Sequence, residues 1–435
     1  MTCERVLSFL LTTWEGGGSV GPAMTVARKL RQHGHRIRVM SDRCNEPEAL
    51  AAGAEFVPWS RAPSRPDRSK DSDVFRDWEA ETPPEQIGRV IDRIMAGPAL
   101  AYAQDIIEEL QRNPVDLVVS SEMLFGVMIG CEAIGQKHAL LTANINLFPT
   151  PGVPPLGPGL LPAKSPEEEA LHEEITRANR QLFERALPPV NAARAEFGLR
   201  PLANIEEQFA SAERMLLGTS QAFDFAPEAI PPHIRYVGPQ LDDPAWAPDW
   251  QSPWGEDDRR PLVLVSFSTS FQDHAAVLQR IADAAADLPV RLLVTLGATI
   301  APSQLRAAAN SRLVEAAPHN MVMPQASLVI THGGHGTVTR ALMHRKPLIV
   351  VPHGRDQNDN AARVAARGAG LVLGAQSSAE EFAAAIQQVL SEPGFGAAAR
   401  ALGDRVAADA EHSPVVEELE RIALRPSASR SLQAA

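Results

Sequence analysis

A glycine-rich turn between an apolar strand and a helix is the feature that most constrains this chain. Residues 327–330 are apolar and strand-like, residues 332–337 read His-Gly-Gly-His-Gly-Thr, and a helix is predicted from about Val338 to His344. The first N–H groups of a helix have no intrahelical acceptor. Together with the helix dipole they favour an anion, and glycines let the backbone come close to phosphate oxygens. The turn therefore predicts a phosphate-binding site.

A polar pair follows the next predicted strand. Residues 347–351 are apolar apart from the leading proline, and Asp356 and Gln357 come soon after them. A carboxylate beside an amide is suited to vicinal hydroxyl groups, and His332 can add a charge-assisted hydrogen bond to phosphate. Each feature alone is often only a tight connection or a surface pair. In register, with a strand between them, they indicate a nucleotide sugar as the ligand.

This stretch resembles the donor-binding signature of the family 1 glycosyltransferases, which include macrolide and other natural-product glycosyltransferases with the GT-B fold. The family pattern is His-Gly-Gly-x-Gly-Thr, a helix, a strand led by proline, then Asp-Gln and Asn-Ala-x-Arg-Val. The matching residues here are His332, Gly333, Gly334, Gly336, Thr337, Pro347, Asp356, Gln357, Asn360, Ala361, Arg363 and Val364. The resemblance extends more weakly over nearly the whole chain.

Length and charge exclude several classes of protein. A chain of 435 residues exceeds what one hydrophobic core usually serves, so two domains are expected. The net charge of −12 argues against nucleic acid or an anionic membrane as a partner. Three scattered cysteines form neither a disulfide framework nor a metal cluster, and no apolar run approaches a membrane span. With no leader expected before the first strand, the sequence predicts a cytoplasmic protein without stable membrane insertion.

Strands alternate with helices on both sides of a linker rich in proline and tryptophan. This alternation predicts an α/β fold, and with the resemblance it implies GT-B architecture: two Rossmann-like doubly wound parallel-sheet domains facing a cleft. The expected divisions are an N-terminal acceptor-binding domain (1–226), an interdomain linker (227–260), a C-terminal nucleotide-sugar donor domain (261–412), a helix that returns to the N-terminal domain (413–424) and a disordered tail (425–435).

Three segments of the N-terminal half depart from this alternation. Residues 61–85 are polar and are interpreted as a long loop or mobile flap. Residues 148–163 are too rich in proline and glycine for regular structure, so they form either a rigid connector or a binding loop. Residues 167–197 are predicted to form one long amphipathic helix.

The resemblance implies the donor contacts residue by residue. The diphosphate is expected against His332 and the N–H groups of the glycine-rich turn, and the sugar hydroxyls against the Asp-Gln pair. Ala316 stands where the family usually has a tryptophan that stacks on the base, and His335 at the variable position is equally compatible with facing solvent. The expected donor-binding residues are His332, Gly333, Gly334, His335, Gly336, Thr337, Asp356, Gln357, Asn360, Ser268, Thr269 and Ala317.

The acceptor half departs from the family at its catalytic dyad. Family members use a histidine after the first strand as the base and an aspartate on a later strand to orient it, whereas Ser19 and Ser121-Glu122 occupy those positions here. Three interpretations remain. The acceptor is acidic enough to need little help, or a carboxylate replaces the dyad, or the chain binds without catalysis. Glu122 is the leading carboxylate, through Ser19 or water, and Glu15 is the second.

The remaining candidates lie at strand ends or in loops that would line the acceptor side. Ordinary core packing is an equal explanation for two of them, Trp14 and Phe125. The expected acceptor-binding residues are Trp14, Phe125, Asn144, Asn146 and Phe148.

Taken together, the sequence predicts an inverting hexosyltransferase that uses no metal or other cofactor. The expected donor is UDP-glucose or a TDP-sugar, because the Asp-Gln pair favours a fully hydroxylated hexose. The expected acceptor is a small lipophilic molecule of phenolic or polyketide type, and the protein is expected to be a monomer or homodimer. The alternatives are an enzyme like UDP-GlcNAc 2-epimerase, which shares the fold, and a non-catalytic GT-B partner protein.

Overall fold

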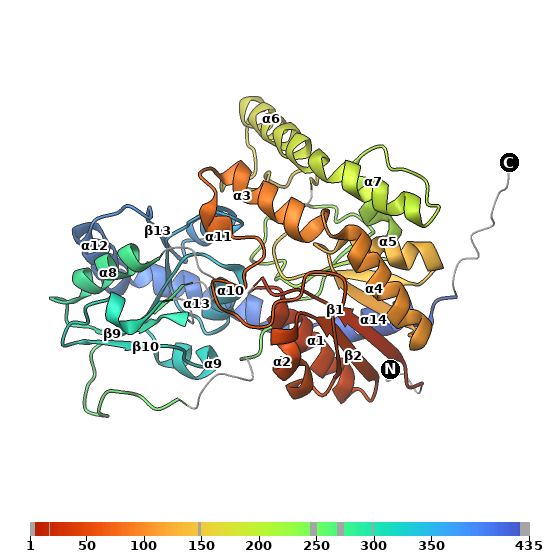
Figure 1. The fold of residues 1–435 in the computed structure, drawn as a ribbon. Coiled ribbons are helices and arrows are strands. Elements are labelled where there is room, and N and C mark those ends of the chain that lie inside the picture. The colour runs from red at the N-terminus through yellow and green to blue at the C-terminus, as the bar shows by residue number, and fades with distance from the viewer. Residues whose placement is uncertain are drawn as a thin grey trace.

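In the computed structural model, each half of the chain builds its own parallel sheet, and the two lobes lie side by side (Figure 1). The structure describes residues 5–16, 18–146, 149–243, 250–267, 274–297 and 300–426. The N-terminal sheet has the order β3-β2-β1-β4-β5-β6-β7, and the C-terminal sheet has the order β10-β9-β8-β11-β12-β13. Every neighbouring pair of strands is parallel, which confirms the predicted fold class.

The strands are short and largely buried, as expected for sheets covered on both faces. In the N-terminal lobe they are β1 (Ser8–Thr12), β2 (Arg36–Ser41), β3 (Glu55–Pro58), β4 (Leu117–Ser121), β5 (His138–Thr142), β6 (Met215–Leu217) and β7 (Ile234–Tyr236). In the C-terminal lobe they are β8 (Leu262–Ser266), β9 (Arg291–Thr295), β10 (Ser311–Val314), β11 (Leu328–Thr331), β12 (Leu348–Val350) and β13 (Gly370–Val372).

Helices cover both faces of each sheet and enclose separate apolar cores. Those of the N-terminal half are α1 (Val20–Gln32), α2 (Glu46–Ala51), α3 (Pro83–Val90), α4 (Ala99–Arg112), α5 (Phe125–Ile134), α6 (Pro166–Phe183) and α7 (Leu187–Glu196). Those that follow are α8 (Ala275–Ala285), α9 (His319–Val322), α10 (His335–Met343), α11 (Gln357–Ala366), α12 (Ala379–Ser391), α13 (Pro393–Glu411) and α14 (Val415–Leu424). None of the described helices is long and apolar enough to cross a bilayer.

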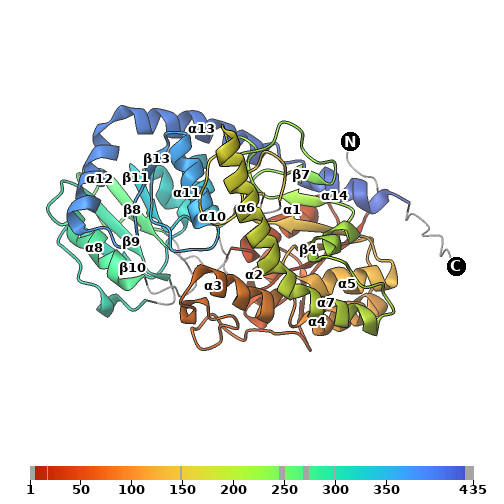
Figure 2. The ribbon, with the colours of Figure 1, turned by 90° about the horizontal axis from the view of Figure 1, so that it is seen from above.

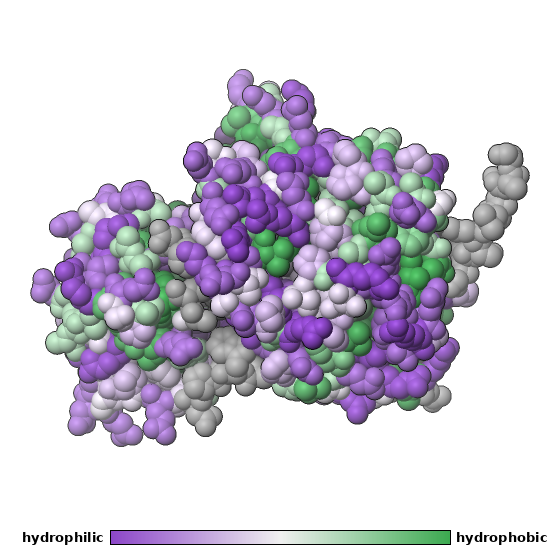
Figure 3. Space-filling model, in the orientation of Figure 1, coloured by the Kyte–Doolittle hydropathy of each residue, from purple (hydrophilic) through white to green (hydrophobic). Residues whose placement is uncertain are grey.

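The expected long helix over residues 167–197 is wrong, because it is divided into α6 and α7. A short 3₁₀ turn, Glu184–Ala186, separates the two, and Pro188 and Pro189 lie in the first turn of α7, where the missing N–H groups cost no hydrogen bond. Helix α6 has no buried residue and projects from the top of the N-terminal lobe (Figures 1 and 3). Its Leu171 is among the exposed large apolar side chains.

The last helix belongs to the N-terminal core although it follows the C-terminal lobe in sequence. Val415 and Leu419 of α14 are buried with Leu7 and Phe9 of the first strand region. Helix α13 runs along the edge of the molecule toward α14, which lies beside α1 (Figure 2). The chain therefore crosses between the lobes twice, once through the linker and once between α13 and α14.

A buried ion pair joins the lobes where they face each other. Arg363 of α11 donates from Nε to Asp224 Oδ1 at 2.8 Å, and Asp224 follows β6 in the N-terminal lobe. The side chains are 2% and 0% exposed. The N–H of Asn146 and the hydroxyl of Tyr236 also donate to Asp224 Oδ2, so both oxygens of this carboxylate are satisfied.

We expect Asp224→Ala to cost about 3–5 kcal/mol of folding free energy, because it leaves the Arg363 guanidinium buried without its partner. The measurement is the thermal unfolding midpoint, with Asp404→Ala as the matched control. Asp404 pairs with Arg345 at 2.6 Å, but both side chains are at least half exposed, so its loss should have little effect. Equal shifts in the two variants would show that the interlobe pair has no special role.

Candidate active site

The predicted phosphate loop follows β11 and leads directly into α10. Gly333 has a φ of 97°, and a side chain there would lie 2.8 Å from Val350. A Cβ at Gly334 would lie 2.6 Å from Nε2 of His332, so the imidazole needs a glycine beside it. The helix starts at His335, three residues before the predicted start, which brings its positive end to the loop.

The first turn of α10 offers fewer free N–H groups than expected. The N–H of Thr337 donates to the carbonyl of Gly334 at 3.1 Å, so the predicted phosphate contact from Thr337 is not free in this structure. The N–H groups of His335 and Gly336 precede it, where a helix supplies no acceptor. The N–H groups that this helix offers to an anion are therefore those of its first two residues, fewer than predicted.

His332 is buried at the carboxyl end of β11, and its charge differs from the prediction. Burial lowers the pKa of His332 to about 3, and the nearby Arg355 and His353 add to this effect. The imidazole is therefore neutral at physiological pH before any anion binds, and a charge-assisted hydrogen bond requires that an incoming phosphate supply the charge that favours protonation.

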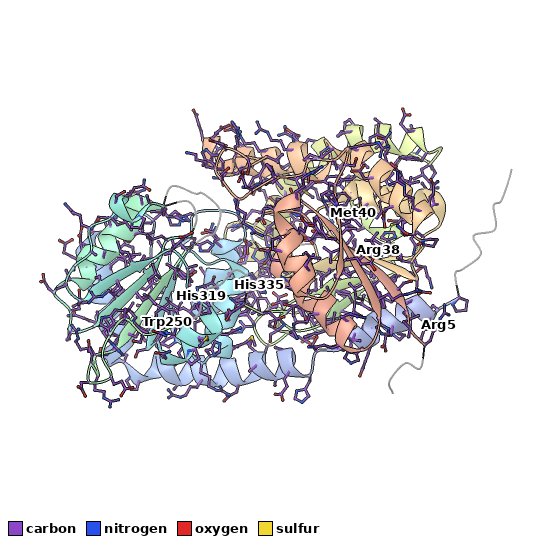
Figure 4. All side chains as sticks on the ribbon, turned by 60° about the horizontal axis from the view of Figure 1, so that its bottom comes forward. Arg5, Arg38, Met40, Trp250, His319 and His335 are labelled. Carbon is purple, nitrogen blue, oxygen red and sulfur yellow. The ribbon has the colours of Figure 1, made fainter. Side chains whose placement is uncertain are left out.

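His335 and Asn360 support the glycine-rich loop after β11. Asn360 Nδ2 donates to the carbonyl of Gly333 at 3.0 Å and to Asp356 Oδ2 at 2.6 Å, and its Oδ1 lies 3.3 Å from His335 Nδ1. His335 is buried against Phe223 of the N-terminal lobe and lies where the lobes meet (Figure 4), so the interpretation that it faces solvent is wrong. Both residues hold the ligand loop in shape.

The two residues of the Asp-Gln pair, Asp356 and Gln357, make different contacts. Oε1 of Gln357 accepts from the N–H of His353 at 2.7 Å, so this buried side chain orders the loop before α11. Asp356 is half-buried immediately before α11, and its Oδ2 accepts from Asn360. Asp356 is the more exposed member of the pair, which suits it to contact sugar hydroxyls.

At the expected base end of the site, position 316 carries an alanine, which offers no aromatic ring to the base. Ala317 is buried in the C-terminal core, and the imidazole of His319 lies 3.0 Å from the hydroxyl of Ser266 at the end of β8. Ser268 and Thr269, the other predicted phosphate contacts, lie outside the described residues.

On the acceptor side, the residues at the dyad positions meet around one small cavity. Ser19 precedes α1, Thr13 follows β1, and Ser121 and Glu122 lie at the end of β4. The cavity they share measures about 10 Å³, which is close to the space needed for one water molecule. The structure therefore places Ser19 and Glu122 together, as the resemblance implied for the residues that replace the dyad.

Glu122 has the properties of a general base. Its side chain is buried, and the hydroxyl of Ser121 donates to Oε2 at 3.3 Å. Burial raises the pKa of Glu122 to about 7, an effect only partly opposed by its own N–H and the hydroxyls of Thr142 and Ser121. A carboxyl that exchanges its proton near neutral pH is matched to acid–base work at that pH.

Glu15, the second candidate, has another role. Its Oε2 accepts from Nε of Arg68 at 3.1 Å, and Arg68 also binds Glu48 and Asn45. Arg68 belongs to the segment interpreted as a mobile flap, so Glu15 fastens that segment to the end of β1.

Two of the five predicted acceptor-lining residues belong to hydrophobic cores instead. Phe125 is fully buried against Phe209, and Trp14 is buried edge-on to Phe75, so core packing is the correct explanation for both. Asn146 is buried and bonds through Nδ2 to the hydroxyl of Thr150. Asn144, half-buried after β5, remains a candidate, and Phe148 lies outside the described residues.

The proline-rich loop makes a contact that the sequence did not reveal. Gly157 and Gly159 donate their N–H groups to the two oxygens of Asp359 at 2.8 and 3.1 Å, and Asn358 Nδ2 donates to the carbonyl of Gly157. Gly159 has a φ of 72°, and a Cβ there would lie 2.6 Å from the carbonyl oxygen of Asn358. The loop therefore spans the two lobes and closes against α11 beside Asp356.

Comparison with known proteins agrees with this geometry. Residues 279–422 match the C-terminal domain of the erythromycin biosynthesis protein CIII-like family. The chain is 29% identical to 4'-demethylrebeccamycin synthase of Lentzea aerocolonigenes, over 92% of this chain and 95% of that protein. It is 24% identical to demethyllactenocin mycarosyltransferase of Streptomyces fradiae, over 90% and 83% of the two chains.

Solved structures show the same fold. The glycotransferase of kitacinnamycin superposes with a TM-score of 0.75 at 17% identity, covering 96% of this chain and 99% of that one. The calicheamicin glycosyltransferase superposes with a TM-score of 0.70 at 22% identity, covering 96% and 98%. Two parallel-sheet lobes of this kind form the GT-B fold. Over most of its length the chain is similar to named glycosyltransferases, and with the match of its C-terminal part this supports a glycosyltransferase of the family 1, macrolide type.

Binding and rate measurements should distinguish the roles of His332 and Asp356, the two main candidates for donor contacts. We expect His332→Ala to weaken binding of UDP and TDP, because the imidazole lies at the phosphate loop. Asp356→Asn should slow sugar transfer and leave the affinity for the free nucleotides nearly unchanged, because the carboxylate is suited to hydroxyl groups only. Titration calorimetry and initial rates measure the two effects, and equal loss of nucleotide affinity in both variants would contradict these roles.

Proposed function

We propose that this protein moves a hexose from a nucleotide sugar to a small lipophilic acceptor with inversion, and that Glu122 is the general base. The observation that carries this proposal is the cavity shared by Ser19, Ser121 and Glu122, at the positions where family members have their histidine and aspartate. A buried carboxyl with a pKa of about 7 replaces the imidazole as the group that accepts a proton near neutral pH.

The reaction balances without any further reactant. The acceptor hydroxyl loses its proton to Glu122, directly or through one water in the cavity, as its oxygen attacks the anomeric carbon. The bond from that carbon to the diphosphate breaks, and the electron pair leaves with the phosphate oxygen. The positive end of α10 and His332 stabilise the departing charge. Ser19 positions the acceptor or the water, because a serine hydroxyl does not titrate near neutrality.

The donor is proposed to be UDP-glucose or a TDP-sugar. A relative from Starmerella bombicola, 24% identical over 87% of this chain, is named UDP-glucosyltransferase B1, and a structural neighbour with a TM-score of 0.66 was solved with dTDP. Asp356 supports a sugar with free hydroxyl groups, and the absence of an aromatic residue at position 316 removes one means of selecting the base. Both UDP- and TDP-linked donors should therefore be tested.

The acceptor is proposed to be a natural product of phenolic or polyketide type. The relatives' names point to rebeccamycin and lactenocin derivatives as the products or substrates of those proteins. In this chain, the proline-rich loop that closes against α11 carries the exposed Leu161, and the helix after it carries the exposed Leu171. These exposed apolar side chains suit contact with a lipophilic molecule.

Glu122→Gln separates the carboxylate base from the acidic-acceptor interpretation. With Glu122 as the base, the variant should lose about 10²-fold or more in rate, because the amide accepts no proton. The ionised carboxylate is the active form, so the wild-type kcat/KM should be low in acid and increase with pH, with a midpoint at about 7. The variant should lose this dependence.

Ser19→Ala is the matched control, since it changes the same cavity and removes no titrating group. Its rate should fall only slightly. If Glu122→Gln keeps full activity and the rates follow acceptor pKa across a series of phenols, the acceptor itself supplies the acidity. If Ser19→Ala is inactive while Glu122→Gln is active, the assignment of the base is wrong.

Metal independence is the second test of the mechanism. We propose that α10 and His332 take the role of a cation at the leaving diphosphate. The described residues contain no group of three or more histidine, cysteine or acidic side chains arranged to hold a metal. Transfer should persist in EDTA. Activity that disappears in EDTA and returns with Mn²⁺ would contradict the scheme.

A further inference from the structure

Three imidazoles gather around Phe267 at the carboxyl ends of β8, β11 and β12. His274 immediately precedes α8, His332 follows β11, and His353 follows β12. Their ring centroids lie 5.0, 5.9 and 5.7 Å from that of Phe267. His274 is 4.5 Å from His353 and 5.9 Å from His332. Only His332 belongs to the signature that the sequence revealed.

Hydrogen bonding within this histidine cluster is incomplete. Nδ1 of His353 lies 2.7 Å from the carbonyl of Val351, which can only accept, so the neutral ring carries its proton on Nδ1. His274 is 2% exposed, and its Nε2 has no hydrogen-bond partner in the described part of the chain. Buried polar atoms are usually paired, so an orphaned imidazole nitrogen beside a phosphate loop points to a ligand.

The charges around the cluster call for an anion. Burial lowers the pKa of His274 to about 2 and that of His332 to about 3, and it also lowers the pKa of His353. The charged groups that act on the three rings are cations, with Arg355 facing His274 and His332, and Arg280 of α8 facing His353. A bound diphosphate would supply the missing negative charge and favour the protonated rings.

We propose that His274 is a further diphosphate-binding residue, and that the histidine cluster takes up a proton from solvent when a nucleoside diphosphate occupies the donor site. When the bond to the sugar breaks, the diphosphate keeps the electron pair and carries one more negative charge than it did in the nucleotide sugar. A proton held by the cluster offsets this charge. The inference rests on the proposed function, because it requires that site to bind the donor.

Calorimetric titration of UDP and of TDP near neutral pH, in buffers of different ionisation enthalpy, counts the protons taken up on binding. Wild-type protein should take up about one proton per nucleoside diphosphate. His274→Gln should abolish most of this uptake and weaken both diphosphates about tenfold, the loss of one charge-assisted hydrogen bond. Affinity for uridine or thymidine, which carry no phosphate, should not change.

His33→Gln is the control, because His33 is an exposed histidine at the end of α1, and it should match wild type. Should His274→Gln fail to fold, side-chain ¹⁵N shifts of wild-type histidines in the UDP or TDP complex decide the matter. At least one ring of the cluster should be an imidazolium there. Neutral rings in that complex, or proton uptake that persists in a folded His274→Gln, would overturn the inference alone. Failure of both diphosphates to bind would instead contradict the proposed function.

Discussion

The buried pair of Arg363 and Asp224 is the interaction on which the arrangement of the site depends. Arg363 lies on α11, whose first turn follows Asp356 and contains Asp359, so fixing this helix to the N-terminal lobe also fixes the sugar-binding end of the donor site. The same carboxylate accepts from the N–H of Asn146, just beyond the strand that ends beside the acceptor cavity. This ion pair, with the bonds of the proline-rich loop to Asp359, holds the donor contacts near the proposed base, and removal of either partner would leave a buried charge.

Burial shifts the pKa values of the candidate residues in the two lobes in opposite directions. It raises the pKa of the Glu122 carboxyl to about 7 and lowers the pKa of the His332 imidazole to about 3. In both cases the neutral form is favoured because the surroundings solvate charge poorly. In the proposed mechanism, the carboxyl accepts a proton from an acceptor hydroxyl, and the imidazoles are proposed to become charged when a diphosphate binds. The two halves of the reaction are therefore matched to charges that the substrates bring.

The sequence was sufficient to predict local structure, but it did not predict which tertiary contacts the side chains make. The strand, glycines and helix of the donor loop lie within a dozen residues, so their order alone predicted an anion site. Asn360 belongs to the same signature, but whether its amide meets a ligand or the loop depends on packing, and it bonds to Gly333. Trp14 and Phe125 were equally compatible with a site or a core for the same reason.

The contact of Gly157 with Asp359 joins residues 202 apart, and no local pattern indicates it. His274 was missed because it belongs to no family motif; only its burial beside two other histidines marks it.

The most direct test of the central claim, that a buried carboxyl stands in for the missing dyad, is the titration of Glu122 itself. ¹³C-labelled glutamate, with the signal assigned by its absence in Glu122→Gln, reports the protonation of this side chain in the free enzyme. We expect a midpoint at about pH 7 that coincides with the pH dependence of kcat/KM. A midpoint near the ordinary glutamate value of about 4.3 would contradict it, because such a carboxylate has no advantage as a base at neutral pH.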